Sequence, residues 1–320
     1  MRGIYYNEFG PAEVLKIGDL PMPEPAADEV LVKVACAGVN PIDRRLRGGE
    51  LQDFFTREWP LTPGWDFAGR IVKVGGDVKG WKPGDDIVGL AFTWHLHHGT
   101  YAEYVPVKAV SIAAKPAEIP FHIAAALPLV SLTAWESLAE YAELKPGQSV
   151  LIQAGAGGLG SAAITIARHL GAKIYTTTRT ENFDYVRSRG ADYPIDYTKE
   201  DYVAVIKARE PGGIDVILES LLVDVPVKAD ISLVKPGGTV VYMNNEPPDM
   251  PEIARNHIKT KFLHHRPDGE SLGRLMKLYQ QGKLALLPVE VLPLEKAVEA
   301  HKRSESGRTH GKLVLKVQDL

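Results

Sequence analysis

The sequence predicts an α/β protein in which a doubly wound parallel sheet domain is inserted into a mostly β domain with a partly open barrel. In the first third of the chain, short strand patterns alternate with Pro and Gly turns. The middle of the chain alternates strand and helix patterns, which favours a parallel sheet covered on both faces. The chain ends in helix and strand patterns that we expect to rejoin the first domain. The predicted ranges are 1–122 and 263–320 for the β domain and 123–262 for the inserted domain.

Composition supports two domains and argues against several classes of partner. The chain has 320 residues, of which 45% are hydrophobic, so it can build two cores. A formal net charge of -3 without a basic domain argues against nucleic-acid binding. The single cysteine, Cys36, cannot form an intramolecular disulfide and fits a reducing compartment. With neither a secretory leader pattern nor an apolar run of membrane length, the sequence predicts a cytoplasmic protein without membrane contact.

The predicted elements follow these patterns in order. In the β domain the strand patterns cover 30–35, 69–74 and 86–90, and turns fall at 63–64, 75–76 and 82–85. A helix is predicted over 121–142, with Pro128 interrupting it. The inserted domain then shows strands at 149–153, 173–178, 194–197, 214–218 and 238–243, and helices at 160–170, 182–189, 202–210 and 226–233. The C-terminal part shows helices at 271–281 and 294–304 and a strand at 312–317.

The strongest single motif is the glycine-rich segment Gly155-Ala156-Gly157-Gly158-Leu159-Gly160. Its first glycine suits a tight turn, its second admits a pyrophosphate, and its third lets helix and strand pack closely. A strand pattern precedes the segment and a helix pattern follows it, which is the context a dinucleotide site requires. The free N–H groups of the helix N-terminus would then face the phosphates.

The end of the next strand indicates NADPH rather than NADH. An acidic residue there would hold a ribose 2′-hydroxyl and repel a 2′-phosphate. The chain instead has Thr178 followed by Arg179, and a hydroxyl with a cation favours the phosphate. Glu181 is expected to lie past the strand, in the turn. The alternative is that Arg179 simply faces solvent.

Taken together, these motifs resemble the zinc-independent medium-chain dehydrogenase/reductase family, in its quinone oxidoreductase (zeta-crystallin-like) branch. The resemblance covers nearly the whole chain and depends on ordered motifs at 38–43, 63–69, 82–85, 99–104, 155–160, 190–192, 195–197 and 311–315. It implies a Rossmann domain inserted into a GroES-like domain, and a homodimer. It also implies a cytoplasmic NADPH-dependent oxidoreductase whose substrate is a small-molecule quinone or enone.

The same resemblance predicts that no catalytic metal is bound. The zinc branch of the family has a cysteine where this chain has Asn40, and a histidine where it has Trp65. Neither side chain can supply a thiolate or an imidazole to zinc. A loop with His95, His97 and His98 is expected to be a surface or cleft-lining loop rather than a metal site, and the pair 264–265 is treated in the same way.

Five further cofactor contacts are implied by the resemblance. Tyr197 would lie near the 2′-phosphate, and Thr133 near the nicotinamide. Asn244 and the backbone around Phe262 would flank the nicotinamide ribose and carboxamide, and Lys312 would fold back over the cofactor. Tyr197 could instead be a packing residue, and Lys312 a solvated strand end.

Without a metal, the expected reaction is hydride transfer to an already polarised acceptor. Donors aimed at the acceptor oxygen would stabilise the developing charge. Asn40 is the predicted catalytic residue, with holding its loop as the alternative. Trp65 and Trp94 are predicted to bind a flat acceptor, although either could be core. The stretch 49–55 lacks the tyrosine that related reductases carry, so solvent is expected to supply the proton.

Two other functions remain open from the sequence. An enoyl-thioester reductase would need a basic surface for its carrier, and none is evident. A non-catalytic NADPH-binding redox sensor would keep the cofactor loop but show no turnover.

Overall fold

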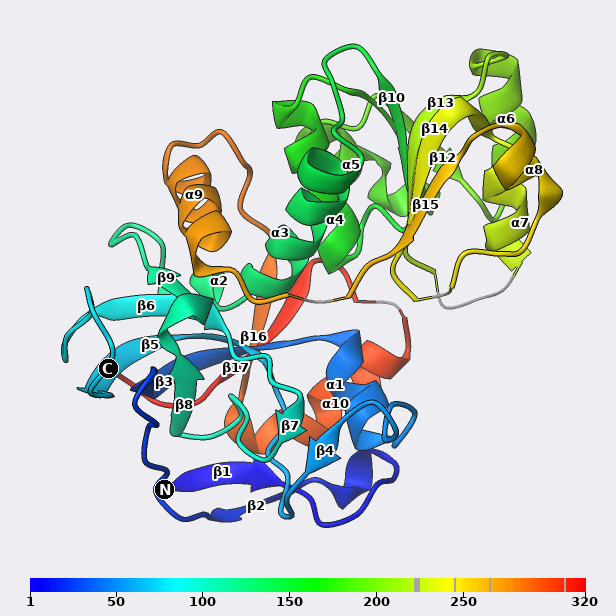
Figure 1. Cartoon of the computed structure of the whole chain (residues 1–320). Helices are drawn as coiled ribbons and strands as arrows, with labels where there is room; N and C mark the ends of the chain where they lie inside the picture. The colour runs from blue at the N-terminus through cyan, green and yellow to red at the C-terminus, as the bar shows by residue number, and fades with distance from the viewer. Residues whose placement is uncertain (222–224, 245, 265, 308) are drawn as a thin grey trace. The chain divides into compact units, whose positions relative to one another are not determined.

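The computed structural model describes residues 1–221, 225–244, 246–264, 266–307 and 309–320, which fall into two compact units (Figure 1). The first unit comprises Met1–Leu132, Arg266–Gly282 and Leu286–Leu320, and the second comprises Thr133–His265 and Lys283–Ala285. Where the sequence predicts a boundary at residue 123, the division falls at Thr133, within helix α3 (Pro128–Trp135).

A seven-stranded sheet organises the first unit, in the order β16-β17-β3-β5-β6-β9 with β8 paired to β3. Its strands are β3 (Glu29–Val39), β5 (Asp66–Val74), β6 (Asp86–Leu90), β8 (Tyr104–Lys108), β9 (Ile112–Ala114), β16 (Val289–Pro293) and β17 (Lys312–Lys316). Two short sheets pair β1 (Arg2–Tyr5) with β2 (Lys16–Asp19) and β4 (Thr56–Arg57) with β7 (His95–Leu96).

Strand β3 brings the two ends of the first unit together. Its apolar residues are buried, and it pairs with β5, β8 and β17. Its pairing with β5 contains two register shifts, which are β-bulges or similar irregularities. The antiparallel pairing with β17 sets Leu313 opposite Val39. The C-terminal strand therefore lies beside the start of helix α1 (Pro41–Arg47).

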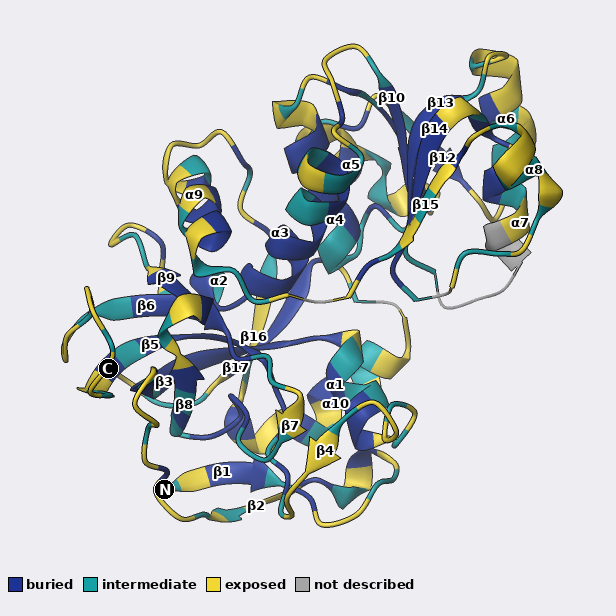
Figure 2. Ribbon diagram, in the orientation of Figure 1, coloured by how far each residue is buried: buried dark blue, intermediate teal, exposed yellow. Residues whose placement is uncertain are grey.

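The helices of the first unit are short. Besides α1 they are α2 (Phe121–Ala124), α9 (Gly269–Gln280) and α10 (Ala297–Glu305), with single turns at Ala12–Val14, Ala109–Ser111 and Leu294–Lys296. In α9, Leu272, Leu275, Met276 and Tyr279 recur at helical spacing and are buried. Figure 2 shows α9 coloured partly as buried and partly as exposed. The carboxylate of Asp268 caps this helix by accepting a hydrogen bond from Ser271 N at 3.0 Å.

The second unit is a doubly wound parallel sheet of six strands in the order β12-β11-β10-β13-β14-β15. Its strands are β10 (Ser149–Ile152), β11 (Lys173–Thr178), β12 (Tyr193–Asp196), β13 (Ile214–Glu219), β14 (Val234–Tyr242) and β15 (Lys259–Phe262). Its helices are α4 (Gly158–His169), α5 (Phe183–Arg189), α6 (Tyr202–Arg209), α7 (Val225–Ile231) and α8 (Pro251–Arg255). Helices α4 and α5 lie on one face of the sheet, and α6 and α7 on the other (Figure 1).

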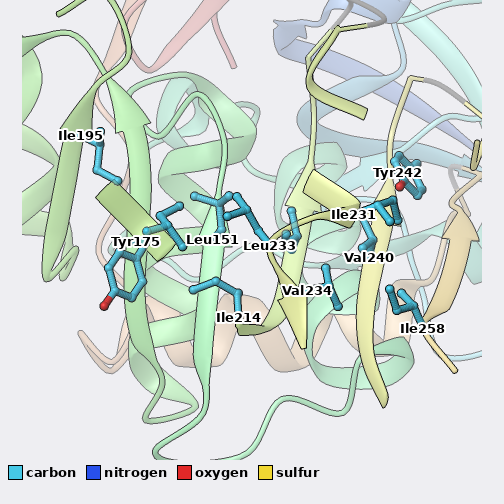
Figure 3. Close-up of a cluster of buried hydrophobic side chains, with 12 residues drawn as sticks. Leu151, Tyr175, Ile195, Ile214, Ile231, Leu233, Val234, Val240, Tyr242 and Ile258 are labelled. Atoms are coloured by element: carbon cyan, nitrogen blue, oxygen red, sulfur yellow. The ribbon is translucent and has the colours of Figure 1, made fainter. Parts of the chain in front are cut away.

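Burial of both sheet faces explains the apolar strands of the second unit. Leu151, Tyr175, Ile214 and Val240 lie on four different strands and belong to one buried cluster (Figure 3). Because all six strands are parallel, their carboxyl ends meet at one edge. The strand order reverses between β10 and β13, and in such sheets ligands bind in the crevice at that point.

Several predicted boundaries differ from the structure for local reasons. The predicted helix 121–142 is divided into α2, α3 and a π-helical turn at Glu136–Tyr141, with the break before Pro128. Strand β15 reads Lys-Thr-Lys-Phe, so it lacks an apolar run and was not predicted. Among the described residues, no helix combines the length and apolar character needed to cross a membrane.

Candidate functional site

The glycine-rich segment forms the turn from β10 into α4. Helix α4 begins at Gly158 with Gly157 as its N-cap, two residues earlier than the sequence predicts. Gly155 N donates to Thr177 O at 3.0 Å, and Ser161 Oγ donates to Gly155 O at 3.1 Å. The first-turn amides of Gly158, Leu159 and Gly160 have no partner within the helix, as at any helix N-terminus. They form an anion-binding end at the carboxyl edge of the sheet.

The three predicted glycine roles match the packing around each position. A Cβ atom on Gly155 would overlap Thr176 Oγ1, and one on Gly160 would overlap Ala154 O. A Cβ on Gly157 would meet only Ala154 O, at 3.4 Å, so its other side is open. Ala154 itself has a φ of 53°, a left-handed conformation that is strained for alanine. The loop is therefore shaped to let a ligand approach its backbone, and a dinucleotide pyrophosphate fits it.

The end of β11 presents a cation beside a phenol. Thr178 is buried, and the Arg179 side chain after it is about half exposed. The pKa of the Arg179 guanidinium is raised, chiefly by its hydrogen bond with the Tyr197 hydroxyl. Glu181 lies past the strand, as predicted, and its carboxylate is 3.9 Å from the Arg179 guanidinium. Thr178, Arg179 and Tyr197 are thus brought together.

The sequence did not identify Lys199 as part of this cluster. The only acidic side chain at the end of β12 is Asp196, whose carboxylate accepts hydrogen bonds from Thr180 N at 2.8 Å and Thr198 Oγ1 at 2.6 Å. The Lys199 ammonium donates to Thr180 Oγ1 at 2.8 Å. Hydrogen bonds from both threonines hold the pKa of Asp196 far below its usual range. The signal was available, because Lys199 follows two residues after Tyr197.

The remaining predicted cofactor residues of the second unit lie on its own elements. Asn244 follows β14, and its Nδ2 donates to Ser220 O at 2.8 Å. Phe262 ends β15 and pairs in register with Tyr242. Thr133 is buried, and its carbonyl accepts a hydrogen bond from Ser137 Oγ at 2.7 Å. Asn244 and Phe262 therefore share the carboxyl edge of the sheet with the glycine loop.

In the first unit, Asn40 lies between two buried charges. Its Nδ2 donates to Asp66 Oδ2 at 2.8 Å, and its Oδ1 accepts a hydrogen bond from the Lys312 ammonium. Lys312 also donates to Val39 O at 3.1 Å and lies 3.5 Å from Asp66 Oδ2. Asp66 Oδ1 accepts from Leu129 N at 2.8 Å. The structure places Lys312 in this network, not at the solvated strand end that the sequence left open.

Burial opposes both charges of this network. Burial raises the pKa of the Asp66 carboxyl, and the positive charge of Lys312 partly offsets this rise. Burial lowers the pKa of the Lys312 ammonium, and the negative charge of Asp66 partly offsets this fall. The side-chain amide of Asn40 bridges Asp66 and Lys312, so Asn40 helps to hold its own loop in place. Asp66 was not singled out from the sequence, although it lies in the motif at 63–69.

Four aromatic side chains form one wall in the first unit. Trp65 and Phe92 meet edge to face at 4.9 Å, Phe92 and Trp94 at 5.0 Å, and Phe55 stacks on Trp94 at 5.3 Å between ring centroids. Trp65 is only 3% exposed, whereas Trp94 is 57% exposed. Trp65 therefore anchors the wall inside the domain next to Asp66, and Trp94 presents it to the outside. The sequence did not identify Phe55 and Phe92 as members of this wall, because isolated phenylalanines are usually interpreted as core residues.

The histidine loop shows no arrangement for a metal. His95 Nε2 is 4.0 Å from Glu58 Oε2, while His97 Nδ1 contacts Glu58 O at 2.8 Å. Within the described residues, no group of three His, Cys, Asp or Glu side chains is placed to hold a metal ion. His264 is one of the described residues covered by this statement, whereas His265 lies outside the described residues.

Two family models match the chain. Residues 26–117 match an alcohol dehydrogenase GroES-like domain, and residues 189–315 match a domain described as zinc-binding dehydrogenase. The second description includes zinc, yet at the two positions compared above this chain has Asn40 and Trp65.

Known relatives cover nearly the whole chain. A tomato (Solanum lycopersicum) protein named 2-methylene-furan-3-one reductase is 34% identical over 98% of this chain and 79% of its own length. An Arabidopsis thaliana protein named NADPH-dependent alkenal/one oxidoreductase, chloroplastic, is 33% identical over 98% of this chain and 79% of its own. The solved structure of the quinone oxidoreductase from Coxiella burnetii matches with a TM-score of 0.89 and 33% identity, over 99% of each chain.

Proposed function

Because the chain belongs to the medium-chain dehydrogenase/reductase family, in its zinc-independent quinone oxidoreductase branch, we propose that it reduces quinones or α,β-unsaturated carbonyls with NADPH. The observation that carries this proposal is the carboxyl edge of the second unit. There the open glycine loop, the helix N-terminus and the Arg179–Tyr197 pair lie at the ends of neighbouring strands.

NADPH supplies a hydride when it is bound. The amides of Gly158, Leu159 and Gly160 hold its pyrophosphate, and Arg179, Tyr197 and Thr178 hold its 2′-phosphate, assisted by Lys199. Thr133, Asn244 and Phe262 are proposed to contact its nicotinamide half. We propose that Lys312 acts on the cofactor site only through Asn40, because its ammonium group contacts Val39 O, Asn40 Oδ1 and Asp66 Oδ2 of the first unit.

The first unit supplies the surroundings for the acceptor. The aromatic wall offers flat apolar faces on which a quinone or enone stacks. We assign Asn40 to the acceptor oxygen. Its Nδ2 carries two hydrogens and donates one to Asp66, so the second can donate to the oxyanion as charge develops. Asn40 and Trp65 replace the ligands of the zinc branch, so hydrogen bonding takes the place of a Lewis acid.

Steady-state oxidation of NADPH with phenanthrenequinone, benzoquinone and a short enone tests this function. We expect turnover with at least one quinone or enone. Tight NADPH binding without turnover on any acceptor would contradict the proposal and favour the redox sensor. Turnover confined to a carrier-bound enoyl thioester would favour the enoyl-thioester reductase.

Replacing Trp94 by alanine is expected to raise KM for phenanthrenequinone about tenfold, since a ring contact contributes about 0.5–1.5 kcal/mol beyond its area. KM for NADPH should change by less than about twofold, because the wall belongs to the other unit. Michaelis–Menten kinetics of both substrates check this. Phe54→Ala is the matched control, since Phe54 is an exposed phenylalanine beside Phe55 that is not one of the four rings of the wall. An equal rise in both variants would show that the wall is not specific.

We also propose a cytoplasmic homodimer. The β15 strand ends the sheet of the second unit and leaves an edge that a second copy can extend. Light scattering after size exclusion tests the dimer, and a monomer at micromolar concentration would contradict it.

A further inference from the structure

A small, partly open cavity lies beside Asp43 in the first unit. Its volume is about 20 Å³, and its lining includes polar and aromatic side chains of four segments, namely Tyr6, Asp43, Thr62, Trp65, His97 and His98. A water molecule needs about 10–15 Å³ of such space and two to four polar partners. The cavity therefore has room for one water molecule.

The Asp43 carboxylate is only half satisfied by the protein. Its Oδ2 accepts hydrogen bonds from Asn40 N at 2.8 Å and from the Tyr101 hydroxyl at 3.0 Å. Its Oδ1 is buried and has no hydrogen-bond partner in the described part of the chain. A buried polar atom without a partner costs about 1–3 kcal/mol, and more when it is charged. An internal water molecule or a proton on Asp43 would remove this cost.

We propose that the cavity holds one water molecule on Asp43 Oδ1, and that Asp43 and this water store the proton that each reduction consumes. The proton-storing role rests on the proposed reductase function, whereas the water and the protonated Asp43 can be detected in the resting protein. It replaces the expectation that the proton comes directly from solvent.

The proton balance closes with groups that are present. Hydride addition leaves a negative charge on the acceptor oxygen. The Asp43 O–H bond breaks, the cavity water passes a proton on, and an O–H bond forms on the acceptor, which leaves Asp43 as a carboxylate. Solvent then returns a proton to Asp43. Trp65 lines the cavity and anchors the aromatic wall, so the water site adjoins the proposed acceptor site. Asp43 supplies the proton through the water and does not itself contact the acceptor.

Burial places the pKa of Asp43 near neutral pH, and the neighbouring groups adjust it in both directions. Burial raises the pKa of Asp43 to about 7, the Asn40 amide lowers it, the Asp66 carboxylate raises it, and Tyr101 and Lys312 lower it. Other titratable or charged groups at the site are Tyr6, His97 and His98, which line the cavity, and Arg47, whose charge acts on Tyr6. Burial lowers the pKa of His98 to about 4, so His98 is neutral when Asp43 titrates.

The first test is the pH dependence of kcat. A stored proton is present below the pKa and lost above it, so wild-type kcat should fall about tenfold per pH unit above about pH 7. In Asp43→Asn this limb should vanish, and kcat below pH 7 should be at least about tenfold lower. Tyr101→Phe is the matched control. It keeps Asp43 but removes a hydrogen bond that stabilises the carboxylate, so its limb should move to higher pH.

The second test does not depend on turnover. Infrared difference spectra of the resting protein should show a neutral carboxylic acid band that disappears as the pH rises through about 7 and is missing in Asp43→Asn. A high-resolution crystal structure should show a water within hydrogen-bond distance of Oδ1. A dry cavity, no such band, or an unchanged pH limb in Asp43→Asn would overturn the inference while leaving the reductase intact. If Asp43→Asn does not fold, the shift in Tyr101→Phe and the wild-type band decide the question. An inactive protein that shows the band would contradict the proposed function instead.

Discussion

Replacing Lys312 by methionine is expected to lower the free energy of unfolding by about 3–5 kcal/mol. Lys312 is the cation of a fully buried network, and the substitution leaves the Asp66 carboxylate without its countercharge. Asn40 would lose the hydrogen bond to its Oδ1 as well. Chemical denaturation at neutral pH measures the effect as a lower midpoint with an unchanged slope.

The same strand provides the control for this variant. Lys316→Met removes an ammonium that is 54% exposed and pairs with Asp319 at 2.8 Å. A surface pair contributes about 0–1 kcal/mol, so this control should remain close to wild type. The difference in free energy of unfolding between the two variants should become smaller as the pH falls. Burial raises the pKa of Asp66, so this carboxylate becomes neutral at low pH and no longer needs a countercharge. Equal stabilities for both variants would show that the network does not hold the Asn40 loop.

Replacing Arg179 by alanine is expected to weaken NADPH binding about 10–100-fold and to leave NADH binding nearly unchanged. A hydrogen bond to a charged group contributes about 1.5–3 kcal/mol, and only NADPH carries the 2′-phosphate that this guanidinium would meet. In the wild type, NADPH should bind at least about tenfold more tightly than NADH. Fluorescence titration with both dinucleotides measures the ratio.

Arg187→Ala is the matched control for the cofactor prediction. Arg187 is an exposed cation on helix α5, and it lies 3.9 Å from Asp184. Its removal changes the net charge equally but touches no predicted cofactor contact. Similar losses in both variants would mean that general charge, rather than the Arg179–Tyr197 pair, attracts the cofactor.

The sequence predicted the second unit well because local patterns dominate there. Strand β11 matches its predicted range, since it is an apolar and β-branched run between clear turns. The glycine loop was identified in its correct place between β10 and α4. The start of α4 was misplaced by two residues because Gly158 and Leu159 can belong to either turn or helix. Strand β15 was missed because an edge strand needs no apolar run.

The first unit was harder to predict because its contacts are long-range. The pairing of β17 with β3 brings Lys312 to Asn40 across most of the chain, and no local pattern encodes that meeting. The aromatic wall joins Phe55, Trp65 and Trp94 from separate segments in the same way. The half-satisfied carboxylate of Asp43 depends on the shape of a cavity, which spacing along the sequence cannot reveal.

The most direct test of the account is the rate of NADPH-dependent phenanthrenequinone reduction before and after exhaustive treatment with EDTA. Because Asn40 and Trp65 stand where the zinc branch has its ligands, the account predicts equal rates in both preparations. Loss of activity on chelation, restored by added zinc, would contradict it.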